Sequence, residues 1–241
     1  MHLVVTGFGP FHGVQSNPTA DLIDYLRTVP DLATRLGARR VDLHVLSVAA
    51  RAADEFGAAL DADAAADPPP PADPPQPPLL IVHLGVDAGC KTPTLALEAC
   101  AYNECLFRCP DEDGVVLGPD RAPCPCTPLG ARLETGVDVE RVRARMMERA
   151  ARGEDGRAAA AAYGVRISRD AGRFLCNYVY ARSLAATTKR RRAAAAAAAD
   201  ALFVHVPRFS VLGEDAQRGA LLGLLRALVE VSSDGCSARN E

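Results

Sequence analysis

The stretch that decides the fold is Leu79-Leu80-Ile81-Val82-His83-Leu84. A short, continuous apolar run of this kind is typical of a strand that is buried on both faces. Further apolar runs occur before and after it, and they alternate with helical patterns. We therefore expect an α/β protein, a three-layer α/β/α sandwich around a largely parallel mixed sheet.

Strands and helices are predicted on both sides of this stretch. The run Leu3-Val4-Val5 ends in a Gly/Pro turn, and Asn17-Pro18-Thr19 then begins a helical pattern. The other expected strands are Val41–Val48, Thr94–Tyr102, Val165–Ile167 and Ala201–Val206, and the other expected helices are Ala49–Leu60, Val137–Arg152, Leu175–Ala186 and Asp215–Val231.

The chain has 241 residues, which is enough for one sizeable domain with its own core. We expect a single domain over residues 1–241 with low-complexity insertions at about 61–78 and 187–200. The first insertion holds eight of the 18 prolines, which favours an extended loop. The second contains Lys189-Arg190-Arg191-Arg192 and seven alanines, which fit either a longer helix or a mobile segment.

Composition argues against several classes of protein. The formal net charge of -3 leaves no basic footprint for nucleic acid, and no apolar run approaches the length of a membrane span. The N-terminus lacks the basic region of a signal peptide, so we expect a cytoplasmic protein whose eight cysteines are reduced thiols.

Three residues from different parts of the chain form a candidate catalytic set. Cys176 is expected in the first turn of a helix, where backbone N–H groups and the helix dipole stabilise a thiolate. His205 ends a predicted strand, where open α/β sheets carry ligand sites, and Glu98 has apolar neighbours that favour pairing with an imidazole. Taken singly, the three also fit a core cysteine, a core histidine and a surface glutamate.

Four motifs place these residues in a wider pattern. In chain order they are Thr6-Gly7-Phe8-Gly9-Pro10-Phe11-His12-Gly13-Val14 with Asn17-Pro18-Thr19; His83-Leu84-Gly85-Val86 leading to Leu97-Glu98, Asn103-Glu104 and Phe107-Arg108-Cys109-Pro110-Asp111-Glu112; Ser168-Arg169-Asp170-Ala171-Gly172-Arg173-Phe174-Leu175-Cys176-Asn177-Tyr178-Val179-Tyr180; and Phe203-Val204-His205-Val206-Pro207. Together they resemble the pyroglutamyl peptidase I family, the pyrrolidone-carboxylate peptidases, and plant and algal members most. The resemblance implies a phosphorylase/hydrolase-like fold.

The resemblance also implies an activity, that of a cysteine exopeptidase, or omega-peptidase. Such an enzyme hydrolyses the amide bond after an N-terminal pyroglutamyl (5-oxoproline) residue, so its partners would be N-terminally pyroglutamylated peptides. It implies no metal and no cofactor. A homo-oligomer is an expectation that the sequence leaves open.

Residue roles follow from the same resemblance. Cys176 would be the nucleophile, His205 the general base and acid, and Glu98 the residue that orients His205. Arg108 and the backbone N–H of Cys176 would stabilise the oxyanion. The remaining matches are Phe8, Phe11 and Phe174, which would form an apolar slot for the pyrrolidone ring, and Asn17, a polar residue beside it. The ordinary alternatives are a surface ion pair for Arg108, a helix N-cap for Asn17 and core packing for the phenylalanines.

Two other functions compete with a peptidase. Cys100, Cys105, Cys109, Cys124 and Cys126 cluster in the sequence and suggest a zinc site, although their spacing lacks the usual C-x-x-C form. A non-peptidase function on the same fold, such as small-molecule binding or a phosphorylase-like activity, is the other alternative. A phosphorylase needs a phosphate cradle, and Gly7-Phe8-Gly9 is a weak signal for one.

Overall fold

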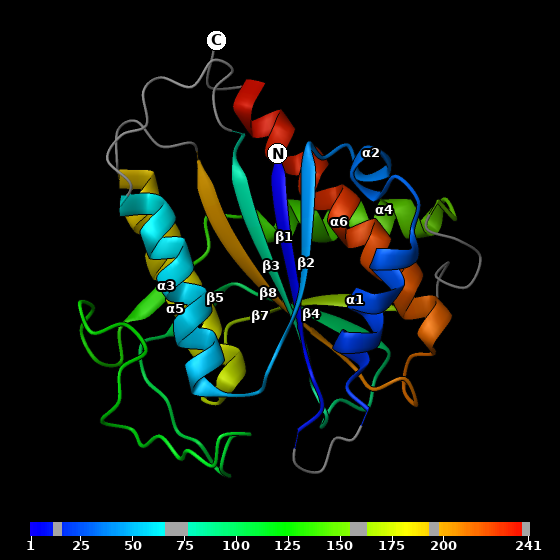
Figure 1. Ribbon diagram of the computed structural model, residues 1–241. Coiled ribbons are helices and arrows are strands. Elements are labelled where there is room, and N and C mark those ends of the chain that lie inside the picture. The colour runs from blue at the N-terminus through cyan, green and yellow to red at the C-terminus, as the bar shows by residue number, and fades with distance from the viewer. Residues whose placement is uncertain (12–15, 66–76, 155–162, 193–197, 238–241) are drawn as a thin grey trace.

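The computed structural model describes residues 1–11, 16–65, 77–154, 163–192 and 198–237. In this part of the chain, six strands form one twisted sheet with helices on both faces (Figure 1). A second, two-stranded sheet lies beside it. The α/β/α sandwich expected from the sequence is confirmed.

The bounds of the elements are as follows. The strands are β1 (His2–Phe8), β2 (Arg40–Leu46), β3 (Leu79–Val86), β4 (Thr94–Glu98), β5 (Cys100–Tyr102), β6 (Arg132–Glu134), β7 (Gly164–Ser168) and β8 (Ala199–Val206). The helices are α1 (Pro18–Thr28), α2 (Leu32–Leu36), α3 (Ala50–Ala65), α4 (Val139–Ala151), α5 (Leu175–Arg192) and α6 (Glu214–Ser237).

The order of strands in the main sheet is β2-β1-β3-β8-β4-β7. Strands β2, β1, β3 and β8 are parallel, whereas β4 pairs antiparallel with β8 and parallel with β7. The carboxyl ends of β1, β3 and β8 therefore meet at one edge of the sheet, where α/β proteins place ligands.

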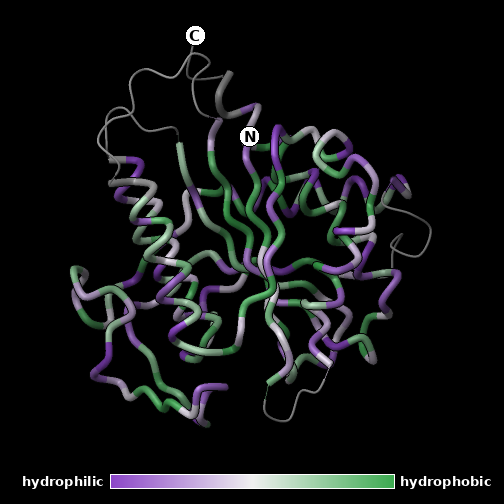
Figure 2. The backbone as a smooth tube through the Cα atoms, in the orientation of Figure 1, coloured by the Kyte–Doolittle hydropathy of each residue, from purple (hydrophilic) through white to green (hydrophobic). Residues whose placement is uncertain are grey.

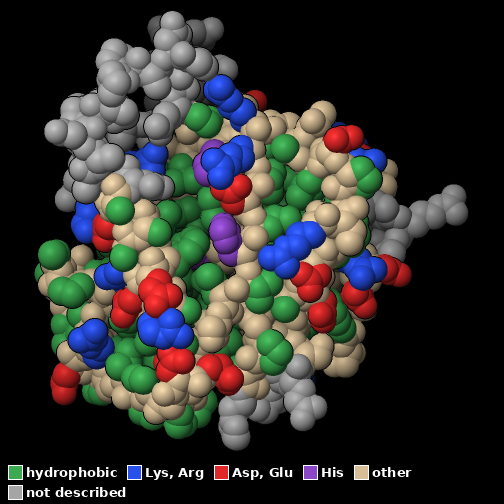
Figure 3. Space-filling model, in the orientation of Figure 1, with side chains coloured by type: hydrophobic (Ala, Val, Ile, Leu, Met, Phe, Trp, Pro, Cys, Tyr) green, Lys and Arg blue, Asp and Glu red, His purple; other side chains and the backbone are tan. Residues whose placement is uncertain are grey.

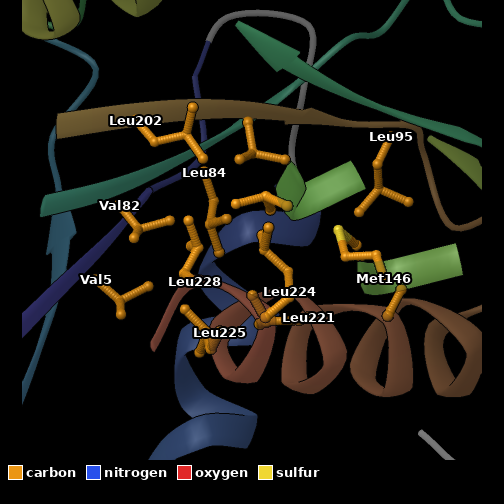
Figure 4. Close-up of a cluster of buried hydrophobic side chains, with 14 of the residues drawn as sticks. Val5, Val82, Leu84, Leu95, Met146, Leu202, Leu221, Leu224, Leu225 and Leu228 are labelled. Carbon is orange, nitrogen blue, oxygen red and sulfur yellow. The ribbon is translucent and has the colours of Figure 1, made fainter. Parts of the chain in front are cut away.

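Strand β3 is buried along nearly its whole length, as its apolar run predicts. On one face, Val82 and Leu84 pack in a cluster with Leu224 and Leu228 of α6 (Figure 4). Helices α1, α2 and α4 cover the same face, and Figure 2 shows the apolar central strands between the layers. Burial of one such large apolar side chain stabilises the fold by about 1.5–3 kcal/mol.

The opposite face is covered by α3 and α5, which pack against each other (Figure 1). Its cluster of apolar side chains includes Ile81 and Phe203 from the sheet and Tyr180 from α5. This is the face on which the candidate catalytic residues lie.

One predicted strand is wrong in its extent. Residues Thr94 to Tyr102 form two strands, because β4 belongs to the main sheet while β5 pairs with β6. The break is at Ala99, whose N–H donates to the carbonyl of Ser168 and whose carbonyl accepts from Thr135. The apolar pattern continues through the break, so only the change of partner reveals it. Helix α2 and strand β6 were not predicted.

The two proposed insertions are partly helical. Helix α3 extends to Ala65, and α5 continues through Arg192, so the second insertion does lengthen the preceding helix. The ends of these helices are joined by an ion pair of 2.9 Å between Lys189 and Asp61. Residues 66–76 and 193–197 of the insertions, and His12 to Val14 of the first motif, lie outside the described residues.

The surface in Figure 3 carries basic and acidic side chains that are intermixed around apolar ones. Exposed ion pairs such as that of Arg51 with Glu55 occur on the described surface, and such pairs contribute little to stability. Among the helices that the structure describes, none is long and apolar enough to cross a membrane.

Candidate active site

Cys176 is the second residue of α5, so it occupies the first turn as predicted. The preceding turn is built from local hydrogen bonds: Asp170 N–H donates to Ser168 Oγ, and Gly172 N–H donates to Asp170 Oδ1. Gly172 has a φ of 79°, which favours glycine. The first backbone N–H groups of a helix have no acceptor within the helix, so they stabilise negative charge on or near the Cys176 sulfur.

His205 and Glu98 come together across two antiparallel strands. Glu98 of β4 pairs directly with Phe203 of β8, and His205 is the next residue of β8 on the same face. This diagonal placement brings His205 Nδ1 to 2.8 Å from Glu98 Oε1. Because a carboxylate only accepts, Nδ1 carries a proton, and Nε2 is the ring nitrogen left for the interaction with Cys176 that raises the pKa of His205.

The environment keeps His205 protonated beside the thiol. Burial lowers the pKa of His205, but hydrogen bonds with Cys176 and Glu98 and the charges of these two groups outweigh burial and raise the pKa to about 10. Glu98 is only 1% exposed, and its Oε2 has no hydrogen-bond partner among the described residues. The buried carboxylate is therefore compensated chiefly by the imidazolium of His205.

A cleft of about 290 Å³, part of it open to solvent, lies directly beside the thiol. Its lining includes four residues proposed from the sequence as the substrate slot, namely Phe8, Phe11, Asn17 and Phe174, together with Cys176. The structure therefore brings all of them into one site. Val48, Gly85, Val86 and Leu175 also line the cleft and were not proposed. The position of Gly85 and Val86 at the carboxyl end of β3 was a usable signal, whereas nothing in the sequence pointed to Val48.

Two of the phenylalanines that line the cleft pack against other aromatic rings. Phe174 meets Phe107 edge to face at 4.7 Å between ring centroids, and Phe8 lies 6.5 Å from Phe203. Such contacts fix ring positions before a ligand arrives. Phe8 both lines the cleft and belongs to the apolar core, so its core-packing alternative is confirmed, while its role in a substrate slot stays a prediction.

Asn17 has a structural role in addition to its place in the cleft. Its Oδ1 accepts from Thr19 N–H at 3.1 Å, which caps α1, and its Nδ2 donates to the Gly9 carbonyl at 3.0 Å. Asn17 therefore holds the turn after β1 against the start of α1. Its helix N-cap reading is confirmed.

Arg108 lies apart from this constellation. Its side chain is exposed, and it is not among the described residues that line the cleft. The neighbouring Phe107 reaches the site instead, through its contact with Phe174. The oxyanion role of Arg108 stays a prediction.

Three thiols of the cysteine cluster, those of Cys100, Cys105 and Cys124, donate hydrogen bonds to backbone carbonyls. Cys105 Sγ donates to the Arg121 carbonyl at 3.0 Å, and Cys124 Sγ donates to the Ala181 carbonyl at 3.3 Å. Across the described ranges there is no group of three or more His, Cys, Asp or Glu side chains that could hold a metal ion.

Solved structures with the same fold were found, although no family model and no curated protein sequence matches the chain. A variant of pyrrolidone carboxyl peptidase from Pyrococcus furiosus superposes with a TM-score of 0.70 at 20% identity, covering 95% of this chain and 99% of that one. Pyrrolidone carboxyl peptidase from Thermococcus litoralis superposes with a TM-score of 0.69 at 20% identity, covering 97% of this chain and 96% of that one. Pyrrolidone carboxyl peptidase from Thermus thermophilus superposes with a TM-score of 0.63 at 27% identity, covering 95% of this chain and 99% of that one. The chain therefore resembles the pyrrolidone carboxyl peptidases and has their fold over nearly its whole length.

Proposed function

We propose that this chain is a pyroglutamyl peptidase, a cysteine peptidase that removes an N-terminal pyroglutamyl residue from peptides. The observation that carries the proposal is the cleft lined by Phe8, Phe11 and Phe174, which opens onto Cys176. Cys176 interacts with His205 strongly enough to raise the pKa of the imidazole, and His205 is paired with the buried Glu98. The similarity to three pyrrolidone carboxyl peptidases supports the same activity.

The proposed reaction proceeds through a thioester. The Cys176 thiolate attacks the pyroglutamyl carbonyl carbon, and a C–S bond forms. When the tetrahedral intermediate collapses, the C–N bond breaks and the His205 imidazolium gives its proton to the departing amine. Water then attacks the thioester while His205 takes a proton from it, which releases pyroglutamate and regenerates Cys176.

The oxyanion needs donors placed beside the reacting carbon. The backbone N–H of Cys176 lies in the first turn of α5, where N–H groups have no acceptor within the helix, and Cys176 lines the cleft. On the family resemblance, Arg108 would add a cationic donor.

The cleft also explains why a pyroglutamyl residue would be selected. The lactam ring is compact and uncharged, so it can leave water for an apolar slot at little cost. An ordinary N-terminus carries an ammonium group, which the slot between Phe8, Phe11 and Phe174 would desolvate without compensation. Nothing in the described site favours a phosphorylase-like reaction over this one.

Location and assembly are part of the proposal only as expectations. Neither the fold nor the site tests a cytoplasmic location or a homo-oligomer. Light scattering on the purified chain measures its assembly directly.

The test is hydrolysis of a pyroglutamyl amide reporter. Wild type should release the amine, and Cys176→Ala and His205→Ala should abolish turnover with thermal unfolding little changed. Cys126→Ala is the matched control, because Cys126 is an exposed cysteine away from the cleft. Retained turnover in Cys176→Ala, or no turnover in wild type, would refute the proposal.

A further inference from the structure

Two buried polar side chains of α5, the helix that carries Cys176, contact the end of β4 and the segment that follows it. They are Asn177 and Tyr180, three residues apart on α5 and both 0% exposed. Residues three apart share one face of a helix, so both can contact the same neighbouring segment. That segment runs from Glu98 to Glu104 and includes β5.

Asn177 binds the backbone of this segment as a strand would. Its Oδ1 accepts from Tyr102 N–H at 2.8 Å, and its Nδ2 donates to the Tyr102 carbonyl at 2.8 Å. Nδ2 also donates to the Glu104 carbonyl at 2.8 Å. Because β6 pairs with the other edge of β5, the Asn177 amide completes the hydrogen bonding of Tyr102. Both amide hydrogens are used, so an acid at this position could not replace the amide.

Tyr180 binds the beginning of the same segment. Its hydroxyl donates to the backbone carbonyl of Glu98 at 2.8 Å. Its ring packs against Phe203 at 5.9 Å between centroids, and Phe203 packs against the His205 ring at 4.8 Å. Tyr180 therefore contacts both the backbone of Glu98 and the aromatic ring beside His205.

These contacts connect the three groups of the proposed catalytic set. Cys176 immediately precedes Asn177, and Glu98 is held at its own carbonyl by Tyr180. We propose that Asn177 and Tyr180 are positioning residues that fix the nucleophile helix against the Glu98 segment and so align Cys176, His205 and Glu98. This inference rests on the proposed function for its effect on turnover.

The physical argument is one of distance. A misplacement of about 1 Å in a reacting group can lower a rate by about 10²-fold, even when the misplaced group is intact. Neither Asn177 nor Tyr180 lines the cleft, so their loss should leave substrate binding largely unchanged. The expected signature is a fall in kcat with KM nearly constant.

The variants are Asn177→Asp, which keeps the shape but replaces both donated hydrogens by a carboxylate charge, and Tyr180→Phe, which removes only the hydroxyl and adds no charge. The matched control is Ser183→Ala on the same helix. Ser183 is also fully buried, and its hydroxyl lies 2.9 Å from Nε2 of the buried His83 rather than in contact with the Glu98 segment. The Ser183→Ala variant therefore measures how the loss of a buried hydrogen bond from α5 by itself affects stability and turnover.

Three readouts are compared: kcat and KM for a pyroglutamyl amide, the rate of Cys176 alkylation by iodoacetamide as a function of pH, and thermal unfolding. We expect kcat to fall roughly 10²-fold in Asn177→Asp and roughly 10-fold in Tyr180→Phe, with KM within about twofold. The pH profile of alkylation should change in Tyr180→Phe, which adds no charge near the thiol and so reports alignment. Ser183→Ala should lose a comparable amount of thermal stability while keeping kcat and the alkylation profile.

Two results would overturn the inference. One is wild-type kcat and alkylation profiles in folded Asn177→Asp and Tyr180→Phe. The other is an equal loss of kcat in Ser183→Ala. If Asn177→Asp does not fold, Tyr180→Phe decides, since it preserves the packing of the ring. If wild type does not hydrolyse the reporter, the proposed function fails, but the alkylation profiles still test the alignment of Cys176 with His205.

Discussion

Gly85 lies directly against Cys176 in the structure. A β-carbon added to Gly85 would lie 3.2 Å from the Cys176 sulfur and 2.5 Å from the ring of Phe203. The ring of Phe203 in turn packs beside His205. The absence of a side chain at the carboxyl end of β3 therefore allows the thiol and the aromatic ring to occupy their positions.

Gly85→Ala should lower turnover strongly, because the added methyl group displaces Phe203 or Cys176 or both. We expect a loss of kcat/KM of about 10²-fold or more for a pyroglutamyl amide, with a folded protein. Gly118→Ala is the control, since a β-carbon there meets nothing within 4 Å. Wild-type kinetics in Gly85→Ala would show that the site tolerates a displaced ring.

Glu98→Gln should reduce activity and shift its pH dependence. The charge and hydrogen bond of Glu98 contribute to the raised pKa of His205, so their loss lowers that pKa. The alkaline limb of kcat/KM should then move to lower pH, with measurable activity remaining. Glu55→Gln, which alters an exposed carboxylate paired with Arg51, should leave the profile unchanged.

The same variant should lose stability in a defined pH window. The pKa of His205 is raised from 6.5 to about 10 in the folded chain, so the folded state holds this proton more tightly than the unfolded state. The stabilisation is fully present below about pH 6.5 and is lost as the pH rises through about 10. Denaturant unfolding should show a larger difference between wild type and Glu98→Gln at about pH 6 than at about pH 10.5. A difference that grows with pH would contradict the assignment.

Cys176 should react first with a sub-stoichiometric amount of iodoacetamide, and activity should fall in proportion. Burial raises the pKa of Cys100, Cys105 and Cys124, the last to about 11, which keeps these thiols protonated at neutral pH. A pyroglutamyl ligand should slow the labelling because it covers the sulfur, and a metal chelator should have no effect. Mass spectrometry that finds Cys126 labelled first, with activity retained, would count against the site.

Shortening the first insertion should leave turnover nearly unchanged. The segment 66–76 connects the end of α3 to the start of β3, whereas the cleft lies at the other end of β3. Loop length alone changes stability by about 0.6 kcal/mol for each doubling. The measurement is kcat and unfolding of a chain in which a short Gly/Ser linker replaces residues 66–76. A large loss of kcat in a folded deletion would assign this segment to the site.

Local patterns in the chain were enough for most of the fold and for part of the site. The apolar run at Leu79 predicted the buried strand, Asn17 and Pro18 predicted the start of α1, and the turn before Cys176 predicted a thiol in a first helical turn. These features depend on neighbours in sequence, through capping, turn geometry and the burial of contiguous apolar residues. Such effects can be read from a short window.

Only the tertiary structure shows which segments that are distant in sequence pair with each other. The antiparallel pairing of β4 with β8 places Glu98 diagonally from His205, and the exchange of partners at Ala99 makes Glu98 the last residue of β4. The same packing puts Gly85 under the thiol and leaves Arg108 on the surface. Strand partners and close packing depend on how all the buried surfaces of the chain fit together. The apolar periodicity of one segment gives no information about the other segments with which it will pack.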